Sequence, residues 1–176
     1  MPLQYAVDDV MPRGFPGTKR SDTRTMTAVN SEATAEIPFG CGVVQNKAAG
    51  LLGDRQAALL PSGATDTFLG VVCRSDVSER FLGTTQAGPA VGMPMVVAYD
   101  GEVLVRVESA VVKGARAFMR YAANGAGKTQ LGAFRADADT TTAVEVKGAY
   151  FRESGAAGSL VWLRLDDAAT RATQSA

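Results

Sequence analysis

The stretch Gly92–Tyr121, GMPMVVAYDGEVLVRVESAVVKGARAFMRY, decides the fold class that the sequence predicts. It holds an apolar run, Met95–Tyr99, and a second β-rich run, Glu102–Val107, with Asp100-Gly101 between them. An Asp-Gly pair between two such runs is typical of a tight hairpin, because both central turn residues need positive φ. A third run, Ala117–Tyr121, follows. The stretch therefore predicts a meander of three strands.

The second run shows what its strand should face. Alternate residues of a strand point to opposite sides, so one face carries Val103, Val105 and Val107, and the other carries Glu102, Leu104 and Arg106. One face is wholly apolar and the other is mixed. This pattern is typical of a sheet that covers a core on one side and meets solvent or a partner on the other.

Strand candidates continue on both sides of this stretch, about every ten to fifteen residues, with glycine-rich turns between them. They are IPFGCGVVQ (37–45), AALLP (57–61), FLGVVCRS (68–75), VEVKGAYFRE (144–153) and LVWLRL (160–165). Gly70 indicates a β-bulge or a close backbone approach, and Lys147-Gly148 interrupts its strand. No long amphipathic helix competes with this reading, so the sequence predicts an all-β sandwich or barrel.

The chain divides into three parts by composition. Residues 1–35 are polar and hold scattered hydrophobic residues without a sustained period, so we expect an extended N-terminal arm. It is either a mobile tail, the simpler interpretation for an isolated chain, or an arm that orders against a neighbouring subunit. Residues 36–166 form the β-sandwich domain, and 167–176 a polar C-terminal tail. Within the domain, residues 76–91 predict a long exposed loop.

Charge and hydropathy exclude two classes of partner. Lysine plus arginine and aspartate plus glutamate number 18 each, so the net charge is zero, whereas a nucleic-acid binder normally carries a basic excess. No apolar run approaches the ~20 residues of a membrane-spanning helix. The N-terminus lacks a basic start and an apolar core, so we expect no secretory signal. The sequence predicts neither direct nucleic-acid binding nor a membrane partner.

The sequence lacks histidine, and its two cysteines lie in apolar segments. The chain has no histidine, the commonest general base and metal ligand. Its two cysteines, Cys41 and Cys73, each lie inside an apolar strand candidate, which favours buried free thiols over a disulfide. We therefore predict that the protein is not an enzyme and has no catalytic residues.

Two motifs resemble ligand-binding loops, one for phosphate and one for calcium, but each lacks residues that the loop requires. GAGKT, Gly125–Thr129, would be a phosphate-binding loop only with a glycine at 122, where Ala122 stands, and with a helix after it. We predict a hairpin tip instead. Asp137 and Asp139 resemble part of a calcium loop, but the bend glycine and the distal glutamate are absent, so we expect a solvated turn. No cofactor and no metal are predicted.

Four aromatic residues leave an alternative function open. Trp162, Phe134, Tyr150 and Phe151 fill the core in the simpler interpretation, because large side chains dominate core packing. Together they could also form a sugar-binding platform. In that case the chain is a β-sandwich carbohydrate-binding module of a phage fibre or surface protein.

The order of the strand and turn segments resembles the structural cement proteins of tailed-phage capsids. The matching segments cover about residues 36–165 and are IPFGCGVV, FLGVVCRS, GMPMVVAYDGEVLVRVES, VKGARAFMRY, GAGKTQLGAFR, VEVKGAYFRES and GSLVWLRL. The resemblance implies a jelly-roll-like β fold on the exterior of the virion capsid. Such a protein is made in the host bacterial cytoplasm and holds capsomers of the major capsid protein together against the pressure of packaged DNA. It acts as a homo-oligomer, a dimer or trimer, without chemistry. Residues 1–35 and the 76–91 loop are expected to carry much of the contact.

Overall fold

The computed structural model describes residues 14–52, 55–74 and 87–166. These residues contain no helix, and so none long and apolar enough to cross a membrane. The strands are β1 (Arg24–Asn30), β2 (Gly42–Gln45), β3 (Leu51–Leu52), β4 (Arg55–Leu59), β5 (Phe68–Cys73), β6 (Pro94–Arg106), β7 (Arg116–Arg120), β8 (Phe134–Arg135), β9 (Ala143–Phe151) and β10 (Leu160–Leu165). The prediction of an all-β fold is confirmed.

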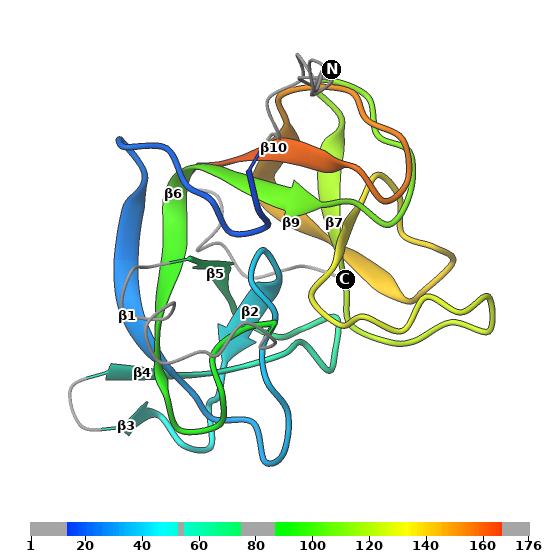
Figure 1. Cartoon of the computed structure of the whole chain (residues 1–176). Helices are drawn as coiled ribbons and strands as arrows, with labels where there is room; N and C mark the ends of the chain where they lie inside the picture. The colour runs from blue at the N-terminus through cyan, green and yellow to red at the C-terminus, as the bar shows by residue number, and fades with distance from the viewer. Residues whose placement is uncertain (1–13, 53–54, 75–86, 167–176) are drawn as a thin grey trace, which may run out of the picture.

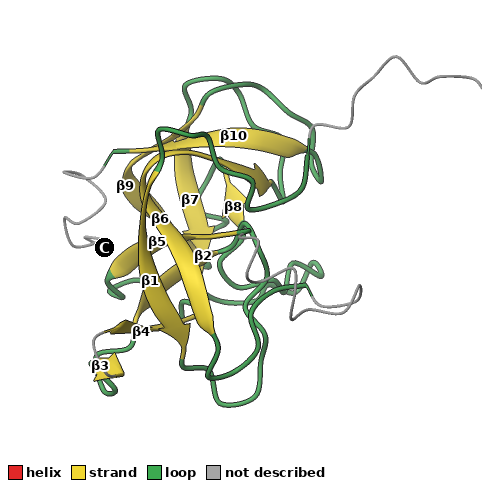
Figure 2. Cartoon of the chain, turned by 60° about the vertical axis from the view of Figure 1, so that its left-hand side comes forward, coloured by secondary structure: helices red, strands yellow, loops and turns green. Residues whose placement is uncertain are grey.

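Five strands close into a barrel. Strands β1, β4, β2, β5 and the first half of β6 are hydrogen-bonded in that order, and β6 pairs back to β1. The β1–β4 pair is parallel and the other pairs are antiparallel. The short strand β3 is added to β4. Figures 1 and 2 show β1 and β6 side by side along the barrel. Closure leaves few unpaired strand edges, which limits unwanted edge-to-edge association.

A second sheet continues from the other half of β6, in the order β6, β10, β9, β7 and β8. Val107, directly after β6, bridges Phe134 of β8, so this sheet also curls back on itself. In Figure 1 β6 runs along the barrel and then turns beneath β10. One strand thus belongs to both halves of the molecule.

The predicted hairpin at Asp100-Gly101 is wrong, because β6 runs through it without a reversal from Pro94 to Arg106. Gly101 has φ +112°, and the pairing of β1 with β6 shifts register beside it, between Arg24 and Thr25. A Cβ at position 101 would lie 2.6 Å from the Cα of Thr23. The glycine therefore permits a bend and a close approach within one strand rather than a turn between two.

The segment before the domain boundary predicted at residue 35 is also part of the fold. Lys19 bridges Val103 of β6, and Arg24–Asn30 form strand β1 of the barrel. The expectation that residues up to 35 bury little of themselves is wrong for this part, because Ala28 and Val29 lie in the interior. Residues 1–13 and the tail 167–176 lie outside the described residues, so the predicted arm and tail remain predictions there.

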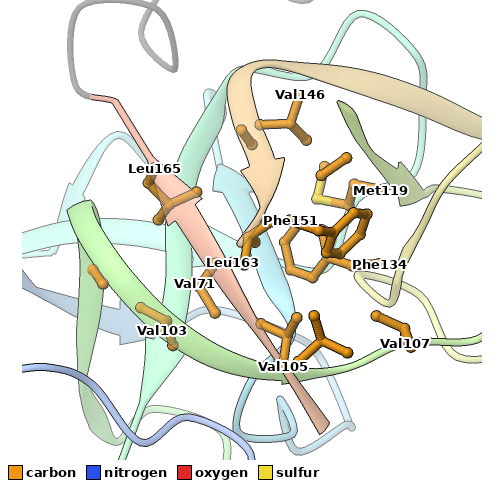
Figure 3. Packing of buried hydrophobic residues seen from close by; sticks show 14 of the residues in the cluster. Val71, Val103, Val105, Val107, Met119, Phe134, Val146, Phe151, Leu163 and Leu165 are labelled. Carbon is orange, nitrogen blue, oxygen red and sulfur yellow. The ribbon is translucent and has the colours of Figure 1, made fainter. Parts of the chain in front are cut away.

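Two hydrophobic clusters lie on opposite faces of the same strands. Val43, Val72 and Val97 belong to the cluster inside the barrel, while their chain neighbours Val44, Val71 and Ala98 belong to the larger cluster shared with the second sheet. Strands buried on both faces carry continuous apolar runs, which accounts for GVV, VVC and MVVA in the sequence. Figure 3 shows Met119, Phe134 and Phe151 gathered in the larger cluster.

Gly70 fulfils both roles predicted for it. The pairing of β2 with β5 shifts register between Val43 and Val44, where Gly70 lies opposite. Its φ is +149°, and a Cβ there would lie 2.1 Å from the carbonyl oxygen of Ala98 in β6. The bulge therefore brings β5 close to β6 at a place where no side chain fits.

Candidate functional site

A groove of about 540 Å³ lies between the 38–41 turn, the end of β6 and the 127–130 loop. Its floor is apolar and buried, and includes Phe39, Val107 and Ala133. Its rim is polar and exposed, and includes Arg106 and Lys128. An apolar floor with a polar rim is the usual composition of a protein-binding surface.

Arg74 forms part of the groove wall through its aromatic neighbours. Its guanidinium carbon lies 4.6 Å from the ring centroid of Phe15 and 5.1 Å from that of Phe39. Both distances are within the range of cation–π attraction. Phe15 is 62% exposed, which is unusual for a large aromatic side chain. Arg74 and Phe39 line the groove, and the exposed ring of Phe15 lies beside Arg74, outside the residues that line it.

The charge of the groove is positive. Among the described residues, Arg74, Arg106 and Lys128 line it, with Glu108 as its one acidic side chain. Glu108 accepts hydrogen bonds from Arg120 and Arg135, so its charge is already balanced. Arg106 Nη1 donates to the carbonyl oxygen of Gly158 at 2.7 Å. The Lys128 ammonium has no hydrogen-bond or ion-pair partner within the part of the chain that the structure describes.

A buried ion network lies behind the groove. The Arg120 side chain has no exposed surface and lies 2.7 Å from Glu108 and 2.5 Å from Asp139. Arg135 lies 3.3 Å and 2.7 Å from the same two carboxylates. Burying charges is costly unless each is paired and hydrogen-bonded, and two arginines against two carboxylates meet that condition.

This network holds the loop that carries Lys128. Asn124 Nδ2 donates to Asp139 Oδ2 at 2.5 Å. Asn124 Oδ1 in turn accepts the backbone N–H groups of Ala126 and Lys128, at 3.0 and 3.1 Å. The position of the Lys128 backbone is thereby tied to Arg120 through Asp139 and Asn124.

The pKa values of two members of the network, Asp139 and Arg120, are shifted toward their charged forms. Hydrogen bonding from Arg120 lowers the pKa of Asp139 to about 2, against opposition from desolvation and with help from Thr142, Asn124 and the charge of Arg135. The hydrogen bond to Glu108 raises the pKa of Arg120 above its usual value. Asp139 and Arg120 therefore keep their charges at physiological pH.

The GAGKT motif forms the predicted hairpin tip. Residues 125–129 join β7 to β8, which pair antiparallel, and they contain turns and no helix. A phosphate-binding loop requires a helix N-terminus at this point. The motif instead presents Lys128 and Thr129 to the groove.

The two aspartates of the ADADTTT segment differ in their surroundings. Asp137 is exposed and pairs with Arg135. Asp139 lies in the predicted turn and its side chain is 23% exposed, but it also pairs with the buried Arg120, which the sequence did not predict. No cluster of three or more cysteine, aspartate or glutamate side chains suited to a metal ion occurs among the described residues. Arginines, rather than a cation, balance these carboxylates.

The aromatic residues do not form one exposed platform. Phe134 and Phe151 have no exposed surface and belong to the core, as the simpler interpretation expected (Figure 3). The ring of Trp162 is covered by the guanidinium of Arg20, 4.9 Å from its centroid. Tyr150 is half-buried on β9. Nothing in this arrangement favours carbohydrate binding.

The structure also tests the prediction made for the two cysteines. Cys41 and Cys73 are buried free thiols, as predicted, and burial raises the pKa of each to about 12.

Of the predicted loop 76–91, residues 76–86 lie outside the described residues. Ala87 lines the groove, and Pro89 accepts hydrogen bonds from Asn30 and Ile37.

The described residues form a closed all-β scaffold that carries a positively charged groove. Over residues 3–166 the sequence matches the family described as "Structural cement protein (E217 gp24/Pam3 gp6)". The chain therefore belongs to the structural cement protein family of phages, and its role is structural, in the virion capsid.

Comparison with solved structures gives the same fold in a viral particle. A chain of "The capsid of Myoviridae Phage XM1" superimposes with a TM-score of 0.65 and 18% sequence identity, covering 94% of this chain and 98% of that chain. At this identity the likeness establishes the fold alone. No curated protein matches the sequence.

Proposed function

We propose that this protein binds the exterior of the phage head and holds neighbouring capsomers of the major capsid protein together against the pressure of packaged DNA. The observation that carries the proposal is the family match over nearly the whole chain. The zero net charge of the sequence supports it, since the protein would bind a protein shell and not the nucleic acid inside.

The closed scaffold supports a role as a rigid link between subunits. Its barrel has few open strand edges, so specific contact falls to grooves, loops and terminal segments. A shell repeats the same contact many times, and repeated weak contacts sum to strong retention when geometry lets them engage together. Copies of the protein associate with each other as dimers or trimers on the shell.

Two segments of the chain are expected to contact neighbouring subunits of the shell. Residues 1–13, the part of the predicted arm beyond the described residues, contact a neighbouring subunit, as does the 76–91 loop. The protein is made in the cytoplasm of the host bacterium and joins the capsid there.

The test is rebinding to shells that lack the protein. Purified protein is mixed with such shells, the mixture is sedimented, and the reconstituted shells are then heated. We expect saturable binding at a fixed ratio to the major capsid protein and a higher temperature of shell disruption. Absence of binding to shells that are otherwise competent would contradict the proposal.

A further inference from the structure

The groove carries an inference that rests on the proposed function and names the partner of this site. We infer that it is a docking site for a segment of the major capsid protein in which a carboxylate neighbours an apolar side chain.

The charge of the groove calls for an acidic partner. Arg106 and Lys128 stand exposed on its rim, and Lys128 has no partner among the described residues. The single acidic lining residue, Glu108, is held by Arg120 at 2.7 Å and cannot serve them. A partner that covers these cations without a counter-charge would desolvate them at a large cost, so a carboxylate on the partner fits this rim.

The floor calls for an apolar side chain beside that carboxylate. Phe39 and Val107 are buried below the rim, and Phe15 stands 62% exposed beside Arg74. Aromatic residues and arginine are enriched at the cores of protein interfaces. The groove is partly open to solvent, and the turn 38–41 and residues 127–130 both contribute to its lining. A segment of a partner chain can therefore enter it from outside.

The wall is fixed before a partner arrives. The Lys128 backbone is bonded to Asn124, and Asn124 is bonded to Asp139 in the buried network. A prearranged loop loses little conformational entropy when it binds, which raises affinity without any added contact.

The first experiment compares two charge-reversed variants in the shell-rebinding assay. Arg106→Glu with Lys128→Glu changes the groove rim, and Lys47→Glu with Lys113→Glu makes the same charge change at exposed sites outside it. We expect the groove variant to bind shells roughly tenfold more weakly or worse, and the control to bind like the wild type. Raising NaCl from about 50 to about 500 mM should weaken wild-type binding, because salt screens exposed charge pairs. Equal binding by the two variants would overturn the inference.

A second experiment identifies the occupant and does not depend on affinity. A photo-reactive amino acid in place of Thr129, which lines the groove, is cross-linked on reconstituted shells, and the attached peptide is sequenced. We expect a major capsid protein peptide with aspartate or glutamate next to an apolar residue. A cross-link to a second copy of this chain, to a peptide without an acidic residue, or to nothing would overturn the docking inference. The proposed function itself fails only if wild-type protein does not bind shells.

Discussion

Arg120 donates a hydrogen bond from Nε to Glu108 Oε1 at 2.7 Å and another from Nη2 to Glu108 Oε2 at 2.8 Å, although its side chain has no exposed surface. The pair joins the strand β7 to the segment that follows β6. Replacing one member of a buried ion pair leaves the other charged and without its partner. The relationship therefore predicts a large effect from a single substitution.

Arg120→Met should lower the free energy of unfolding by about 3–5 kcal/mol, because Glu108 and Asp139 lose their buried partner. Urea unfolding followed by tryptophan fluorescence measures this. Arg116→Met is the matched control, since Arg116 is 75% exposed and pairs with Glu145 at 3.1 Å. The control should cost less than about 1 kcal/mol. A similar loss in both variants would mean that the network contributes nothing beyond surface pairing.

Asp139 predicts how stability depends on pH. Its pKa falls from 3.8 in the unfolded chain to about 2 in the folded protein, so the unfolded state binds its proton first as pH falls. The stabilisation is fully present above about pH 4 and is lost as the pH falls toward 2. Asp139→Asn should therefore lose less stability than the wild type across this window. Parallel curves for the two proteins in acid titrations of unfolding would contradict the assignment.

Gly101 predicts a backbone effect in the middle of β6. Gly101→Ala should lower the free energy of unfolding by about 2 kcal/mol or more, because φ is +112° and the new Cβ would meet Thr23 at 2.6 Å. Gly114→Ala is the control: its φ is +82°, and a Cβ added there would meet no atom within 4 Å. It should cost about 1 kcal/mol from the backbone alone. Thermal unfolding of both variants separates the close approach from the conformational cost.

The thiols of Cys41 and Cys73 should be inert in the folded protein. Burial raises the pKa of each to about 12, so almost none of either thiol is ionised at about pH 8, and only the thiolate reacts. A colorimetric thiol reagent should label neither cysteine in buffer and both in strong denaturant. Rapid labelling of native protein would show that one of the two sites opens to solvent.

Deleting residues 2–13 tests the predicted contact arm. Deleting residues 2–13 should weaken shell binding and leave the thermal midpoint nearly unchanged, because β1 begins only at Arg24. Removing the tail 167–176 is the matched control. Full shell binding after deletion of residues 2–13 would show that this segment is not a contact arm. A deletion extended to residue 30 would remove β1 and unfold the barrel, so it could not answer the question.

The sequence predicted those strands that can be recognised from the apolar pattern of their own residues. LVWLRL alternates cleanly and forms β10 at the residues expected, Leu160–Leu165, and FLGVVC forms β5. It did not predict β1, because RTMTAVN is polar and threonine-rich and is recruited only by pairing with β6 and β4. It placed a turn at Asp100-Gly101 because the two residues suit a hairpin as well as they suit a bend within a strand. Long-range pairing decided between these.

The groove and the ion network behind it could not be predicted from the sequence, because they also depend on long-range contacts. Glu108, Arg120, Arg135 and Asp139 each look like surface charges in sequence, and only the fold brings them together. The one available signal was the density of charge in the 135–139 segment, RADAD, beside a strand candidate. The sequence did exclude nucleotide binding at GAGKT, because the requirements of that motif are local.

Strand β6 also gives the molecule a mechanical axis. Its first half is bonded to β1 and β5 and its second half to β10, so one covalent backbone crosses both halves. A pull that separates the barrel from the second sheet along this strand must shear many interstrand hydrogen bonds at once, instead of opening them one after another. A load carried along β6 therefore falls on one continuous backbone and on the interstrand hydrogen bonds of both halves.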